Sequence, residues 1–161
     1  MHITNPAGLA LLVAGTELPA RLQAWLPDVP VACAGTPSEL AALLRDPRWR
    51  AVAVDVGALG DRAEELLVRL SGLFPDVPLV AIGGSADARR LAPLVAAGAV
   101  QRFLRQPLGR TRTRACLEAM LSRPDCAARA VRPAVASTRV PAFVRSFVVT
   151  RRVRHGLVAA G

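Results

Sequence analysis

Short apolar runs alternate with amphipathic segments along residues 8–122, and this alternation limits the fold more than any other feature of the chain. Each apolar run is as long as a buried strand, and each amphipathic segment is as long as a short helix. Strands that are separated by helices pair in parallel, and the helices cover both faces of the sheet. The pattern therefore predicts a doubly wound α/β domain.

The alternation predicts five strands and five helices. We expect the strands at 9–13, 31–34, 51–54, 79–82 and 102–104. We expect the helices at 18–25, 37–45, 61–73, 87–97 and 110–121. The second helix begins with a capping box at Thr36, in "TPSE". In the third helix, the buried face should carry Leu66, Leu67, Leu70 and Leu73.

Functional groups of doubly wound sheets gather at the carboxyl ends of the strands. Those ends are Ala14-Gly15, Ala34-Gly35, Asp55, Gly83-Gly84 and Arg105-Gln106. Asp55, in the stretch "AVAVDVG", is the only carboxylate among them. Any acidic chemistry at this edge of the sheet therefore depends on Asp55.

In the order and spacing of its elements, the segment 8–122 resembles the receiver domain of bacterial two-component response regulators. The resemblance is carried by "LALLVAG", "AVAVDVGALGDRAEELL", "VPLVAIGGSAD" and "AAGAVQRFLRQPL". It implies a flavodoxin-like (βα)5 fold, a three-layer sandwich whose parallel sheet has the strand order 2-1-3-4-5. It also implies that Asp55 lies where the family accepts a phosphoryl group.

The resemblance fails at the positions that assist phosphoryl transfer. The family has two acidic residues after the first strand that hold Mg²⁺, a Thr or Ser after the fourth strand and a Lys after the fifth. Here these positions are Ala14 and Gly15, Gly83, and Gln106. Ala and Gly offer no ligand to a hard cation, and a neutral amide does not neutralise phosphoryl charge as an ammonium does.

We therefore predict a pseudo-receiver, a noncatalytic signalling module without metal or cofactor that acts by binding another signalling protein. For Asp55, three roles stay open. Its carboxylate could cap backbone N–H groups at the following turn, or it could serve a binding role of another kind. Alternatively, the chain is a working phosphorelay receiver phosphorylated on Asp55, with nearby Glu17 as a substitute metal ligand.

The basic charge is confined to the C-terminal part of the chain. All 21 basic residues are Arg; residues 101–161 hold 13 of them against 2 acidic residues, and residues 1–100 hold 8 against 10. In the family, the fourth helix, fifth strand and fifth helix form a contact surface, here about 86–121. We expect it to bind an acidic partner or, alternatively, a second copy of the chain. This interaction face comprises Arg89, Arg90, Arg102, Arg105, Arg110, Arg112 and Arg114.

We divide the chain into a receiver-like domain, 1–122, and a basic tail, 123–161. The tail begins with a linker rich in Pro, Ala, Ser and Arg. In "AFVRSFVVTRRVR", a helix would place Phe143 and Phe147 on an apolar face, and Arg151 and Arg152 would add positive charge. This combination suits a membrane surface or a partner. A DNA-binding or membrane-tethered regulator is the alternative, but we expect no nucleic-acid partner because the tail contains no recognisable reader.

The cysteines indicate a reducing compartment. Cys33, Cys116 and Cys126 are far apart and form no CxxC motif, so we expect neither a disulfide framework nor a metal cluster. Cys33 should be a small buried hydrophobe in its strand. No apolar run approaches the roughly 18–20 residues of a membrane span, so we expect a cytoplasmic protein that associates with a membrane only through its tail.

Overall fold

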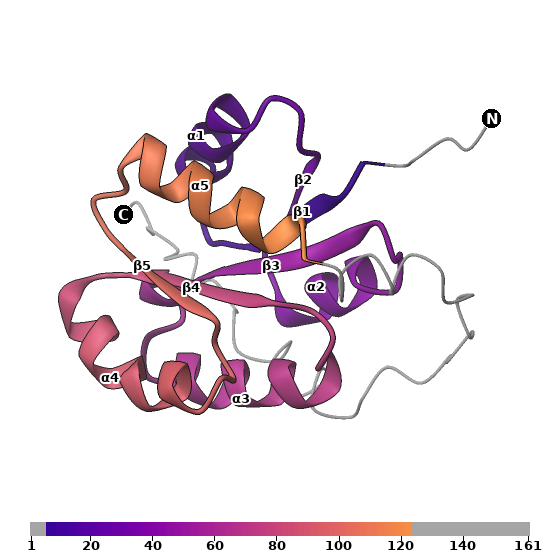
Figure 1. Ribbon diagram of the computed structural model, residues 1–161. Coiled ribbons are helices and arrows are strands. Elements are labelled where there is room, and N and C mark those ends of the chain that lie inside the picture. The colour runs from indigo at the N-terminus through magenta and orange to yellow at the C-terminus, as the bar shows by residue number, and fades with distance from the viewer. Residues whose placement is uncertain (1–5, 124–161) are drawn as a thin grey trace, which may run out of the picture.

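The computed structural model describes residues 6–123 of the 161-residue chain. They form a parallel five-stranded sheet in the order β2-β1-β3-β4-β5, with helices on both of its faces (Figure 1). The predicted fold class and strand order are confirmed.

The observed elements lie within two residues of the predicted limits. The strands are β1 Gly8–Leu12, β2 Val31–Ala34, β3 Trp49–Asp55, β4 Leu79–Gly83 and β5 Arg102–Arg105. The helices are α1 Glu17–Trp25, α2 Pro37–Leu43, α3 Ala63–Leu73, α4 Ser85–Ala96 and α5 Arg110–Leu121. Two short 3-10 turns, η1 Val56–Ala58 and η2 Gly60–Arg62, connect β3 to α3, and η2 takes the place of the predicted start of the third helix. They lie directly after Asp55 and so shape the loop at that carboxylate.

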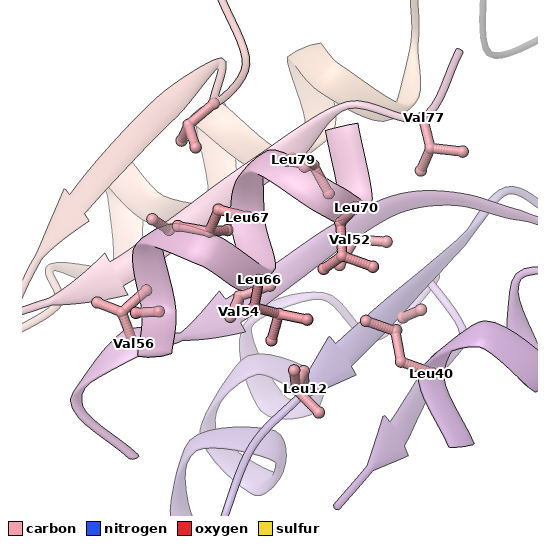
Figure 2. Close-up of a cluster of buried hydrophobic side chains, with 14 of the residues drawn as sticks. Leu12, Leu40, Val52, Val54, Val56, Leu66, Leu67, Leu70, Val77 and Leu79 are labelled. Carbon is pink, nitrogen blue, oxygen red and sulfur yellow. The ribbon is translucent and has the colours of Figure 1, made fainter. Parts of the chain in front are cut away.

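Successive residues of β3 contribute to opposite sides of the sheet, which gives the three layers of the fold. Val52 and Val54 belong to the core under α2, α3 and α4, whereas Ala51 and Ala53 belong to the core under α1 and α5. Figure 2 shows the first of these cores, where Leu66 and its neighbours on α3 meet the sheet. Because β3 is buried on both faces, its sequence is apolar at every position from 51 to 54.

The predicted cap of α2 is present. Thr36 Oγ1 accepts a hydrogen bond from the backbone N–H of Glu39 at 3.2 Å. Glu39 Oε2 accepts one from the N–H of Gly35 at 2.7 Å, one residue earlier than in a standard capping box.

Two predicted burials are wrong. Cys33 is exposed, because β2 is an edge strand that pairs only with β1. Leu73 is 41% exposed, because it is the last residue of α3 and the following Phe74 packs against the core instead.

Some predictions fall outside the described residues. Phe143, Phe147, Arg151 and Arg152 lie there, and the proposed domain boundary after residue 122 stays a prediction. Within 6–123, no helix combines the length and the apolar character that a membrane span requires.

Candidate functional site

A pocket of about 710 Å³ opens at the carboxyl end of the sheet, where β1, β3 and β5 end. Asp55 is the last residue of β3 and pairs in register with Ile82 of β4. The structure brings Asp55, Gly15 and Gln106 of the predicted site together around this pocket. The lining residues are Val13, Gly15, Thr16, Glu17, Leu18, Arg21, Asp55, Gln106, Pro107 and Leu108.

The carboxylate of Asp55 is partly buried, and this desolvation raises the pKa of Asp55 above its ordinary value. The backbone amides of Gly57 and Ala58 face the carboxylate and act in the opposite direction, lowering its pKa, while the negative charge of Asp87 raises it further. The side chain makes no capping hydrogen bond of good geometry to η1.

The end of β1 offers the pocket no metal ligand set. Ala14 and Gly15 are both exposed and carry no carboxylate. Glu17, in the first turn of α1, does line the pocket, and Arg21 lines it one helical turn later. Among the described residues, no group of three or more His, Cys, Asp or Glu side chains is placed to hold a metal ion.

The position at which the family has a hydroxyl, Gly83, is buried and closely packed. A Cβ atom on Gly83 would lie 2.6 Å from Val56 Cγ2 and 2.9 Å from Asp87 Oδ2. Asp87 reaches this place because its Oδ2 accepts a hydrogen bond from the N–H of Gly84 at 3.0 Å, at the beginning of α4. The space for a side chain at position 83 is therefore taken by two other residues.

Gln106 follows β5 directly, and its backbone N–H donates a hydrogen bond to the carbonyl of Gly83 at 2.8 Å. Its side chain is exposed and lines the Asp55 pocket, and the Gln106-Pro107 peptide bond is cis. Gln106 thus lies at the edge where the family has its Lys, with a neutral amide in place of a charge.

Arg90 links α4 to the loop that follows Asp55 through a set of hydrogen bonds, which we call the Arg90 clamp. Its guanidinium donates to the carbonyl of Gly60 at 3.0 Å, to Asp61 Oδ1 at 3.3 Å and to Asp87 Oδ1 at 3.1 Å. Gly60 adopts φ of 58°, a left-handed conformation that favours glycine. Arg90, which the sequence predicts for the interaction face, is therefore engaged within the molecule.

The other predicted residues of the interaction face divide into two groups. Arg114 is paired with Glu118 at 2.7 Å, within α5. Five are exposed and take part in no ion pair with any residue in the described part of the chain: Arg89, Arg102, Arg105, Arg110 and Arg112. This second group can offer its charge to a partner.

Sequence reasoning missed Arg21 as a pocket residue and gave Glu17 only a secondary place. Both lie on α1, which begins just after the strand end that forms one wall of the pocket. Their spacing of four residues was the available signal, since residues i and i+4 lie on the same side of a helix.

No family model and no curated protein matches the sequence. Solved structures match it in fold. The N-terminal signal receiver domain of a two-component response regulator from Bacteroides fragilis superposes with a TM-score of 0.66 at 17% identity, over 73% of this chain and 98% of that one.

Two further structures with a similar fold are not named as receiver domains. The structure of adenylate cyclase from Rhodopirellula baltica gives a TM-score of 0.62 at 19% identity, over 72% of this chain and 87% of that one. A putative pilus assembly protein from Burkholderia thailandensis gives 0.59 at 19% identity, over 72% and 98%.

The chain thus has the fold of response-regulator receiver domains, as its sequence predicts. The superpositions establish a shared fold, but the sequence identities in these three cases are at most 19%. One fold serves many functions. What the chain does must therefore be argued from its own residues.

Proposed function

We propose that this protein is a cytoplasmic pseudo-receiver, a noncatalytic signalling module that acts by binding another protein rather than through Mg²⁺-dependent phosphorylation. The observation that carries this proposal is the packing at Gly83, where Val56 and Asp87 fill the space that a phosphoryl-binding hydroxyl would need. The close contact makes the loss of the hydroxyl a feature of the packed core rather than an isolated substitution.

The composition of the Asp55 pocket supports the same proposal. Phosphoryl transfer to a carboxylate depends on positive charge that neutralises the incoming group. Ala14 and Gly15 provide no metal ligands, Gln106 is uncharged, and no group of three or more His, Cys, Asp or Glu side chains in the described part of the chain is placed to hold a metal ion. Arg21 is a cation that lines the pocket, but its charge is not among the influences on the pKa of Asp55.

The exposed arginines of the interaction face favour a partner that is acidic. Arg102 and Arg105 lie on the edge strand β5, and Arg110 and Arg112 lie on the neighbouring helix α5. Four unpaired guanidinium groups on adjacent elements create a positive potential that attracts and orients an acidic surface. A homodimer through this face would bring like charges together, so we favour a different protein as the partner.

The alternative with a specific observation behind it is a working phosphorelay receiver, because Asp55 does face a pocket that Glu17 also lines. Intact-mass spectrometry of the full chain after incubation with acetyl phosphate and Mg²⁺ separates the two functions. We expect no gain of a phosphoryl group. A Mg²⁺-dependent gain that disappears in Asp55→Asn would establish the phosphorelay function instead.

An acidic probe tests the interaction face. We expect an oligo-glutamate peptide to bind the full chain at low salt, and to bind the double variant Arg102→Gln/Arg105→Gln more weakly. Arg45→Gln/Arg48→Gln, in the segment between α2 and β3, is the control for loss of two positive charges. Equal binding by both double variants would contradict a role for this face and would leave the basic tail, with its membrane or DNA-binding alternatives, as the contact region.

A further inference from the structure

A second pocket, of about 590 Å³, lies between the edge strand β5 and helix α5. It shares no residue with the Asp55 pocket, and its volume is in the range of small-molecule sites. Its lining residues are Gln101, Arg102, Phe103, Leu104, Arg112, Ala115, Cys116, Ala119, Met120 and Arg123.

Three exposed arginines line this pocket from three places in the chain. Arg102 comes from β5, Arg112 from α5, and Arg123 from the segment just after α5. None of the three forms an ion pair with a residue of the described segment 6–123, and no Asp or Glu lines the pocket. The nearby acidic residue of α5, Glu118, is already bonded to Arg114 at 2.7 Å. The pocket therefore carries an uncompensated positive charge.

The charges of Arg102 and Arg112 both act on Cys116, which also lines the pocket. Its thiol is partly buried, and burial raises the pKa of Cys116, while the charges of Arg102 and Arg112 act to lower it. Two arginines from different elements thus lie within electrostatic reach of one atom that lines the pocket.

Gln101 adds a directional polar group. Its Oε1 is buried and has no hydrogen-bond partner within the described part of the chain. A buried amide oxygen is normally satisfied, and Gln101 lines the pocket, so a rotation of its side chain toward the pocket would let a ligand supply the missing hydrogen bond. The rest of the wall is apolar or small: Phe103 and Leu104 come from β5, and Ala115, Ala119 and Met120 come from α5.

We propose that the pocket between β5 and α5 binds a phosphorylated small molecule, whose phosphate pairs with Arg102, Arg112 and Arg123 and whose organic part donates a hydrogen bond to Gln101 Oε1. A phosphate is favoured over a carboxylate because it carries more than one negative charge and enough oxygens for several guanidinium groups. The apolar wall accommodates an organic body such as a base or a sugar.

Calorimetric titration of the full chain with ADP tests the inference, with pyrophosphate and adenosine as the two partial probes. We expect ADP to bind more tightly than either probe, and more weakly as salt is increased. Arg112→Gln should weaken ADP binding at least about tenfold, as expected for the loss of one charged contact. Arg45→Gln, which removes an exposed arginine outside the pocket, should leave it unchanged.

Gln101→Leu separates the amide from the charges. We expect it to weaken ADP binding and to leave pyrophosphate binding as it is, because pyrophosphate has no organic donor. Absence of ADP binding at millimolar concentration would overturn the inference, as would equal effects of Arg112→Gln and Arg45→Gln. ADP binding no tighter than that of pyrophosphate would also contradict it. Arg102 and Arg112 also belong to the interaction face, but the titration contains no partner protein, so its result does not depend on whether that face binds one.

Discussion

The carboxylate of Asp87 lies against the backbone of Gly83, so that a Cβ atom on Gly83 would be 2.9 Å from Asp87 Oδ2. The same carboxylate accepts a hydrogen bond from the N–H of Gly84, which follows directly. Gly83 is thus the point at which β4, the loop after β3 and the beginning of α4 come into closest contact.

Restoring a hydroxyl at this point should destabilise the protein. We expect Gly83→Thr to lower the free energy of unfolding by about 1–3 kcal/mol, since the new side chain meets Val56 and Asp87 in a filled space. Urea denaturation of the two proteins measures the difference. Gly84→Ser is the matched control, because a Cβ there would lie 3.7 Å from Asp87 and Ser is a good N-cap residue, so its stability should change by only a few tenths of a kcal/mol. A Gly83→Thr protein as stable as the wild type would show that the loop and α4 can move apart easily.

The sequence predicted the framework of the sheet well, for a physical reason. The run from Ala51 to Val54 is apolar at every position because β3 is covered on both sides, and such a run can be recognised without knowing its neighbours. Cys33 shows the limit of this reasoning: β2 is also a short apolar run, but its place at the edge of the sheet leaves Cys33 exposed.

The candidate site was predicted less completely. Asp55, Gly15 and Gln106 could be located from strand ends, and the structure brings them to one pocket. Arg89 and Arg90 are identical and adjacent in the sequence, but only Arg90 turns toward Asp61 and Asp87. Neighbouring residues of a helix point about 100° apart, and which of them meets a loop 30 residues away depends on packing that local sequence does not encode.

The Arg90 clamp should contribute modestly to stability. Asp61 is fully exposed, so its pair with Arg90 is screened, whereas the bonds to Gly60 and Asp87 are better protected. We expect Arg90→Met to lower the free energy of unfolding by roughly 0.5–1.5 kcal/mol, most of it from the loss of the bonds to Gly60 and Asp87. Arg89→Met removes an exposed arginine without these bonds and should change stability by less than about 0.5 kcal/mol in urea denaturation. If both variants lost the same free energy of unfolding, the hydrogen bonds of Arg90 to Gly60, Asp61 and Asp87 would contribute nothing to stability beyond the presence of one positive charge.

The pH dependence of stability should report on Asp55. Burial raises the pKa of Asp55 above its ordinary value of 3.8, so the folded protein holds this proton more tightly than the unfolded chain does. The contribution of Asp55 to the free energy of unfolding is therefore greatest below 3.8 and falls as pH rises through the raised pKa. Asp55→Asn removes this loss, so the variant should gain stability relative to the wild type between acidic and neutral pH. Urea midpoints of both proteins at several values from pH 3.5 to 7 measure the trend, with exposed Asp28→Asn as the control; a constant difference across this range would contradict it.

The end of β1, unlike Gly83, has room for the groups that the family carries there. A Cβ atom on Gly15 would meet nothing within 4 Å, and Ala14 is exposed, so carboxylates at these positions would extend into solvent beside the Asp55 pocket. We expect the double variant Ala14→Asp/Gly15→Asp to bind Mg²⁺ together with Asp55, since three carboxylates then converge on one hard cation. The measurement is the rise of the thermal midpoint with added MgCl2, which should be seen in this variant and be lost again when Asp55→Asn is added.

The wild type should show no such rise. If its Mg²⁺ response were as strong as that of the double variant, Asp55 and Glu17 would already hold the ion without the added carboxylates. If the double variant responds as expected, Gly83 rather than the edge of the pocket is the larger obstacle to phosphoryl chemistry in this fold, because only Gly83 requires the core to be repacked.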